Sequence, residues 1–97
     1  MPTLGDVLRS IGEIDDELII YVARDGRPNV SSIVELITLD LIGSVNPDFR
    51  YLLEVQLAKD VMETWSEWRD GRASTIYEAC AAVVYYSEHD AYIPVEG

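Results

Sequence analysis

The chain has 97 residues and a formal net charge of -11 at pH 7, yet 48% of its residues are hydrophobic. This composition excludes a disordered chain and predicts one compact domain over residues 1–97. No apolar run approaches the roughly 20 residues of a membrane span, and the N-terminus lacks the basic and apolar regions of a signal peptide. We therefore expect a cytoplasmic protein.

The acidity restricts the class of partner. A phosphate backbone is repelled by this charge, and the few Lys and Arg residues are scattered along the sequence, which argues against direct nucleic-acid binding. A negative surface can speed association with a basic protein or simply provide solubility. We expect a basic protein partner, no nucleic acid bound directly and no membrane.

A short helix and two strands are predicted in the N-terminal half. Thr3 and Asp6 have the spacing of a capping box, and Gly12 is a natural helix stop. The β-branched runs Leu18–Val22 and Ser32–Leu39 predict two strands that pair antiparallel across a long loop. One helix face is indicated by apolar residues three or four apart: Leu4, Val7, Leu8 and Ile11.

A long helix is predicted next. Asn46 followed by Pro47 has the form of an N-cap and first helical residue, and Gly71 marks the end. Alternation through residues 49–55 leaves open a short strand followed by a helix that begins near Val55. The helical reading rests on apolar residues spaced by three or four: Phe49, Leu53, Leu57, Val61, Trp65 and Trp68.

A final helix is expected from Ile76 to about Glu88, because Thr75 and Glu78 form another capping box. This segment is apolar nearly all round, so it is either central in the core or shared with a partner, which allows a homodimer through this helix. Residues 91–95 could add an edge strand or lie against the core. The predicted fold is α+β, a small antiparallel sheet packed against two or three helices.

Two acidic groups are candidates for binding a basic partner. The densest group precedes the first strand: Glu13, Asp15, Asp16 and Glu17. The second follows one face of the long helix: Asp60, Glu63 and Glu67. Each group is either a docking surface or a solvated face, and Lys59 is expected to pair with Glu63.

Aromatic residues suggest a second binding patch. Tyr and Trp are enriched at binding hot spots, whereas Trp65 and Trp68, three apart on a helix, favour the core. The tyrosines gather near the C-terminus: Tyr77, Tyr85, Tyr86 and Tyr92.

Residues suited to catalysis are scarce. His89 lies between Glu88 and Asp90, where it could act as a general base, but a last-turn position near the helix dipole explains it as well. Cys80 lies in an apolar run that favours a core thiol. With no phosphate loop and no nucleophile elbow, we expect no enzyme, no cofactor and no metal site; a small enzyme built on His89 is the alternative.

A resemblance covers most of the chain except residues 24–48. It rests on the opening Thr3–Leu8, the strand Leu18–Val22 and a closing pattern of two tyrosines, any three residues and then Asp-Ala-aromatic, here Tyr85, Tyr86, Asp90, Ala91 and Tyr92. These segments resemble a family of small acidic bacterial proteins of unknown function. The resemblance implies no activity, but the size and charge are similar to those of toxin immunity proteins.

These observations favour a non-enzymatic protein-binding module. We expect an immunity-like or antitoxin-like protein that neutralises a basic partner through its acidic surface. The alternatives are a nucleic-acid mimic that inhibits a nuclease, as in phage anti-restriction or anti-CRISPR proteins, and a homodimeric structural subunit.

Overall fold

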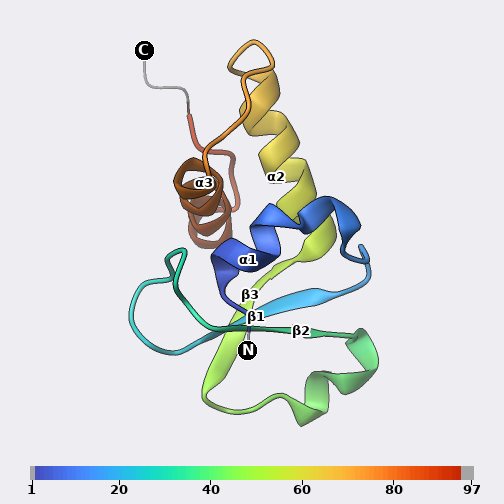
Figure 1. Cartoon of the computed structure of the whole chain (residues 1–97). Helices are drawn as coiled ribbons and strands as arrows, with labels where there is room; N and C mark the ends of the chain where they lie inside the picture. The colour runs from blue at the N-terminus through green and yellow to red at the C-terminus, as the bar shows by residue number, and fades with distance from the viewer. Residues whose placement is uncertain (1, 95–97) are drawn as a thin grey trace.

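The computed structural model describes residues 2–94, which form a three-stranded antiparallel sheet with three α-helices over one face (Figure 1). The strands are β1 (Ile19–Ala23), β2 (Val34–Ile37) and β3 (Phe49–Glu54). The helices are α1 (Leu4–Arg9), α2 (Val55–Glu67) and α3 (Ile76–His89), with short 3-10 helices η1 (Ile11–Glu13) and η2 (Leu39–Ser44). The predicted α+β class is confirmed.

The sheet has β1 in its centre, with β2 and β3 at its edges. β1 and β2 pair antiparallel, with Ile20 opposite Leu36 and Val22 opposite Val34. The pairing predicted from the two apolar runs is therefore confirmed. Because alternate residues of a strand face the same side, Ile20, Val22 and Val34 point together into the core, where all three are fully buried.

The helix predicted to begin at Pro47 is wrong up to Glu54, because Phe49–Glu54 form strand β3. Asn46 does not cap a helix; its Oδ1 accepts the N–H of Asp48 at 2.9 Å and shapes a turn before the strand. Pairing with the free edge of β1 satisfies the backbone groups of β3, and this outweighs the local cap signal. α2 then begins at Val55, which is the alternative noted from the alternation.

A β-bulge places two consecutive leucines of β3 in the core. Ile20 pairs with Leu53 and Tyr21 pairs with Tyr51, so Leu52 is an extra residue between the two pairs. Leu52 and Leu53 are only 1% and 3% exposed. In a regular strand one of them would face outward, whereas a bulge redirects a side chain.

Both predicted capping boxes are present. The Thr3 hydroxyl accepts the N–H of Asp6 and the Asp6 carboxylate accepts the N–H of Thr3, and Thr75 and Glu78 make the same reciprocal pair at the start of α3. These hydrogen bonds satisfy N–H groups that have no partner within the helix. They also lower the pKa of the Asp6 and Glu78 carboxyls, chiefly through the backbone N–H of each threonine.

The predicted helix stops are displaced. α1 ends at Arg9, and Gly12 lies inside η1 rather than at the end of α1. α2 ends at Glu67, before Gly71. Gly71 has a φ of +81° and donates its N–H to the carbonyl of Ser66 at 2.8 Å, so it closes the turn after α2, in a conformation that glycine adopts at low cost.

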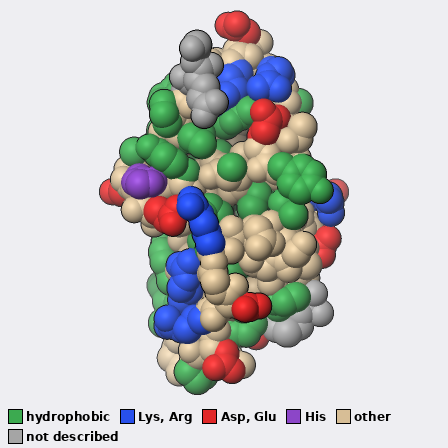
Figure 2. Space-filling view, turned by 90° about the vertical axis from the view of Figure 1, so that its left-hand side faces the viewer, with side chains coloured by type: hydrophobic (Ala, Val, Ile, Leu, Met, Phe, Trp, Pro, Cys, Tyr) green, Lys and Arg blue, Asp and Glu red, His purple; other side chains and the backbone are tan. Residues whose placement is uncertain are grey.

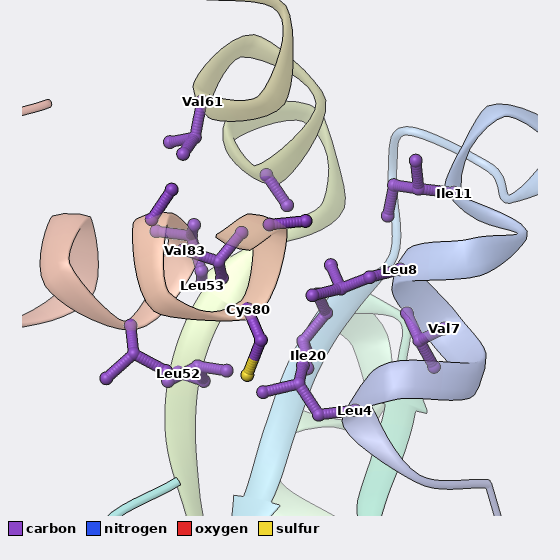
Figure 3. Packing of buried hydrophobic residues seen from close by; sticks show 14 of the residues in the cluster. Leu4, Val7, Leu8, Ile11, Ile20, Leu52, Leu53, Val61, Cys80 and Val83 are labelled. Atoms are coloured by element: carbon purple, nitrogen blue, oxygen red, sulfur yellow. The ribbon is translucent and has the colours of Figure 1, made fainter. Parts of the chain in front are cut away.

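The core lies between the sheet and the helices, and all three α-helices contribute to it (Figure 3). Leu8 of α1, Val61 of α2 and Val83 of α3 are buried against strand residues such as Ile20. Cys80 is buried within this cluster, as expected of a core thiol, and burial raises the pKa of the thiol.

The segment after α3 returns along the core. Tyr92 and Ile93 pack against the buried cluster, and residues 91–94 form no strand; Val95, the last residue of the expected edge strand, lies outside the described residues. Within residues 2–94, no helix has the length and apolar character needed to cross a membrane.

Candidate functional site

The acidic loop predicted as a docking surface connects η1 to β1. Asp15 Oδ1 accepts the N–H of Glu17 at 2.9 Å, which folds the loop on itself. Lys59 of α2 donates its Nζ to the carbonyl of Ile14 at 2.7 Å and pairs with Asp16. The expected pairing of Lys59 with Glu63 is therefore replaced by a link between α2 and the loop. The carboxylates of the loop are exposed: Glu13, Asp15, Asp16 and Glu17.

The second predicted acidic group lies on the outer face of α2. Asp60, Glu63 and Glu67 are exposed, whereas Val61 and Trp65 on the opposite side are buried. Asp60 follows Lys59 in α2, and Glu67 lies two turns further along the helix.

An acidic hollow of about 480 Å³ lies where this loop meets the end of the sheet. Its carboxylates come from three separate parts of the chain: Asp16 and Glu17 from the loop, Asp40 from η2, and Glu54 from the end of β3. The remaining lining residues carry no charge: Ile19, Thr38, Leu39 and Gln56. No Lys or Arg lines the hollow, and of its four carboxylates Asp16 is paired with Lys59 from outside the lining.

Two residues of the acidic hollow were missed by sequence reasoning. Glu54 is paired with Ile19 across the β1–β3 ladder, and only a strand at Phe49–Glu54 places it there, so the helical prediction hid it. The alternation of Phe49, Tyr51 and Leu53 was the signal that could have found it. Asp40 has no such signal, because its position depends on how η2 leaves the edge of the sheet.

Exposed apolar residues adjoin the acidic hollow. Leu39, which lines it, is 71% exposed. Leu41 and Ile42 follow in η2 and are exposed as well. Apolar residues beside a negative hollow offer a partner both contact area and charge, and protein interfaces combine an apolar core with a polar rim.

The predicted tyrosine patch is divided between two sides of α3. Tyr77 and Tyr85 line an apolar groove of about 530 Å³ between α3 and the β1–β2 connection. Tyr86 and Tyr92 lie elsewhere, packed against the core, with ring centroids 5.3 Å apart. Trp68, predicted to be buried, is 50% exposed and meets Tyr92 edge-on at 5.8 Å.

The apolar groove is also lined by Cys80 and Val84 of α3, by Pro28 and Val30 of the β1–β2 connection, and by Ile93 of the segment after α3. At its edge, Arg27 pairs with Glu88 at 2.9 Å and links the β1–β2 connection to the C-terminal part of α3. On this side of the molecule, hydrophobic side chains gather between basic and acidic ones (Figure 2).

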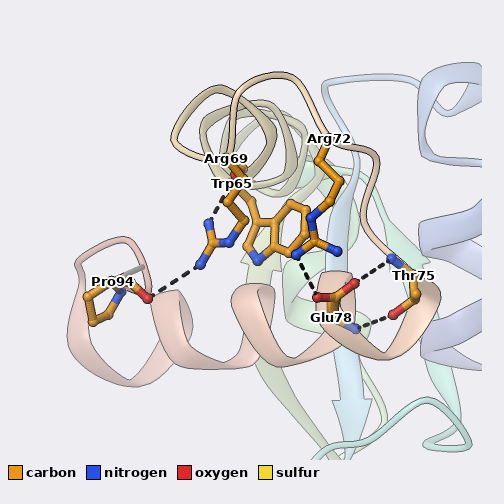
Figure 4. A network of polar contacts seen from close by, with 6 residues as sticks. All are labelled: Trp65, Arg69, Arg72, Thr75, Glu78 and Pro94. Atoms are coloured by element: carbon orange, nitrogen blue, oxygen red, sulfur yellow. Dashed lines mark hydrogen bonds and ion pairs between the residues drawn. The ribbon is translucent and has the colours of Figure 1, made fainter. Parts of the chain in front are cut away.

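Two arginines lie beside Trp65, on the side of α3 that faces α2 (Figure 4). Arg69 lies 4.2 Å and Arg72 4.8 Å from the ring centre of Trp65, which is buried as predicted. Arg69 also donates to the carbonyls of Trp65 and Pro94, and Arg72 pairs with Glu78 at 3.2 Å. These contacts fasten α2, the start of α3 and the segment after α3 to one another.

His89 occupies the last turn of α3, where it is exposed and its ring lies 4.2 Å from that of Tyr85. This placement fits the helix-terminal role expected from the sequence. Among the side chains of residues 2–94, no three or more of His, Cys, Asp and Glu are grouped so as to hold a metal ion.

Comparison of the chain with protein-family models, with curated proteins and with solved structures finds no match.

Proposed function

We propose that this chain is a non-enzymatic protein-binding module that docks a basic protein at the acidic hollow and neutralises it, as an immunity-like or antitoxin-like inhibitor would. The observation that carries the proposal is the convergence of Asp16, Glu17, Asp40 and Glu54 from three parts of the chain around one hollow without a basic residue in its lining. Like charges repel when they are brought together, so a cationic group from a partner stabilises this arrangement.

The chemistry of the acidic hollow favours Lys or Arg side chains. Their aliphatic stems can lie along apolar surface while their charged ends stay among polar groups. Ile19 and Leu39 provide the apolar surface, and the four carboxylates surround it. The exposed Leu41 and Ile42 extend the apolar contact. A partner with basic side chains interspersed with aliphatic ones is the best fit.

The acidic residues next to the hollow speed the approach of a basic partner and need not contact it in the complex. Glu13 and Asp15 precede Asp16 in the chain and are exposed, so they add negative charge close to the acidic hollow. Charges this close together steer a basic partner toward the site, and such steering raises association rates roughly 100-fold or more at low salt. The effect weakens steeply as salt shortens the screening length below about 10 Å.

Binding can be mapped by titrating the isotope-labelled chain with a short peptide in which Lys and Leu alternate. We expect the largest amide chemical-shift changes at residues 16–19, 38–42 and 54–56, and we expect high salt to remove them. A peptide with Gln in place of Lys serves as the matched control. Shifts spread evenly over all acidic segments, or centred on α3, would show that the acidic hollow is not the binding site.

A further inference from the structure

We propose that the basic protein that docks at the acidic hollow also covers the open face of the sheet, and that it contacts this face with apolar side chains flanked by Lys and Arg. The open face is the side of the sheet that the three α-helices leave uncovered (Figure 1). The inference rests on the proposed function, because it extends the same interface from the acidic hollow onto the sheet.

The residues of the open face follow from the alternation of the strands. Ile20 and Val22 of β1 belong to the core under the helices, so Ile19, Tyr21 and Ala23 point to the opposite side of the sheet. Each of these three residues has a neighbour in β3 and another in β2 or just before it. The open face therefore consists of three rows that cross the sheet.

The first row joins the open face to the acidic hollow. Ile19 lies between Ile37 of β2 and Glu54 of β3. Both isoleucines are buried, yet neither is part of the core cluster under the helices. Ile19 and Glu54 also line the acidic hollow. A partner seated in the hollow is therefore already in contact with the first row of the open face.

The second row is aromatic and accessible. Tyr21 lies between Glu35 and Tyr51, and the rings of the two tyrosines meet edge-on with their centroids 6.1 Å apart. Tyr51 is 48% exposed, and Tyr21 and Glu35 are half-buried. Paired tyrosines give a partner a large contact area with few rotatable bonds, which is typical of binding hot spots.

The third row continues the apolar surface. Ala23 is paired with Phe49 and donates its N–H to the carbonyl of Ile33 at 3.0 Å. Ile33 is 37% exposed, and Ala23 and Phe49 are half-buried. The side of an antiparallel sheet that faces water usually carries polar residues. An apolar surface in that place is typical of an interaction site.

The charges decide which partner fits. Glu35 and Glu54 are the only charged residues in the three rows. Arg50 is the only basic residue in the three strands, but its neighbour in the ladder is the buried Val22, so it belongs to the helix side. A second copy of this acidic chain, a nucleic acid and an anionic membrane would each bring negative charge against these carboxylates. A basic protein surface that carries apolar side chains complements both the charge and the contact area.

A double variant tests the open face without changing any charge. Ile33→Thr combined with Tyr51→Thr removes two exposed apolar side chains and keeps β-branched residues in their place. It should bind the Lys–Leu peptide, in which Lys and Leu alternate, about tenfold more weakly than the natural chain does. Tyr77→Gln is the matched control, because Tyr77 is 70% exposed on α3 and should leave this affinity unchanged.

A second peptide separates apolar contact from charge. A peptide in which Lys and Ala alternate has the same charge as the Lys–Leu peptide but smaller apolar side chains. It should bind the natural chain more weakly than the Lys–Leu peptide does, and the double variant should bind it as well as the natural chain does. Circular dichroism establishes that each variant keeps the fold.

A measurement on the natural chain needs no substitution. The bound Lys–Leu peptide should shield the Tyr51 ring and the Ile33 methyl groups from a soluble paramagnetic agent, whereas the Tyr77 ring should stay accessible. Unshielded Tyr51 and Ile33, or equal affinities of the double variant and the natural chain, would overturn the inference and leave binding at the acidic hollow intact. If neither peptide bound at the acidic hollow, the proposed function would fail and the inference with it.

Discussion

The Nζ of Lys59 donates a hydrogen bond to the carbonyl oxygen of Ile14 at 2.7 Å, across 45 positions of the chain. The same ammonium group pairs with Asp16. One basic side chain in the first turns of α2 therefore fixes the path of the most acidic loop in the protein. Its role in the acidic surface is structural, because it holds carboxylates of the acidic hollow in place while it offsets a single negative charge.

Lys59→Met should loosen this loop although it makes the surface more negative. The methionine keeps most of the aliphatic stem but cannot bond to the Ile14 carbonyl, which costs about 1 kcal/mol of the free energy of unfolding. The N–H groups of Glu17 and Leu18, which bond to Asp15, should exchange with solvent faster. Hydrogen exchange measures this; Arg9→Met, which removes one positive charge at an exposed site elsewhere, should leave these amides unchanged.

The bulge in β3 gives a prediction for stability. Leu52→Ala should lower the free energy of unfolding by about 2–5 kcal/mol, because it removes a large side chain from a closely packed core. Tyr51→Ala is the neighbouring control and should cost less, since Tyr51 is 48% exposed. Urea unfolding compares the two. Equal losses would indicate that Leu52 does not point into the core.

The capping box of α3 gives a pH dependence. The folded state lowers the pKa of Glu78, so the ionised carboxylate contributes stability above its ordinary pKa and loses it as the pH falls through the lowered value. Glu78→Gln lacks this charge. The natural chain should therefore be more stable than Glu78→Gln at neutral pH, and the difference should vanish in acid. If the stability difference between the natural chain and Glu78→Gln grew as the pH fell, the prediction would be contradicted.

Cys80 should resist thiol reagents in the folded protein. It is buried, and burial raises the pKa of the thiol, so both access and the thiolate fraction are reduced. A colourimetric thiol reagent should label it slowly in buffer and quickly in urea. Fast labelling of the native chain would mean that α3 separates readily from the sheet.

Local signals in the sequence identified those elements whose stabilising contacts are themselves local. The Thr3–Asp6 and Thr75–Glu78 boxes fixed the starts of α1 and α3, and the β-branched runs located β1 and β2. Phe49–Glu54 was assigned incorrectly because its backbone is satisfied by β1, far away in the sequence, and a helix-like spacing of apolar residues coexisted with the alternation. The acidic hollow could be predicted only in part for the same reason: Glu54 and Asp40 reach Asp16 through pairing and packing that no short segment encodes.

The most direct test of the proposed function compares two variants of equal charge for binding to the Lys–Leu peptide over a series of salt concentrations. One carries Asp16→Asn, Glu17→Gln, Asp40→Asn and Glu54→Gln; the other carries Asp25→Asn, Asp48→Asn, Asp70→Asn and Asp90→Asn, at exposed positions outside the acidic hollow. We predict that the first variant loses at least about tenfold more affinity than the second at low salt, because close charge pairs contribute more than distant ones. Equal losses in the two variants would contradict the proposal, because the charge of the whole molecule, rather than the acidic hollow, would then govern binding.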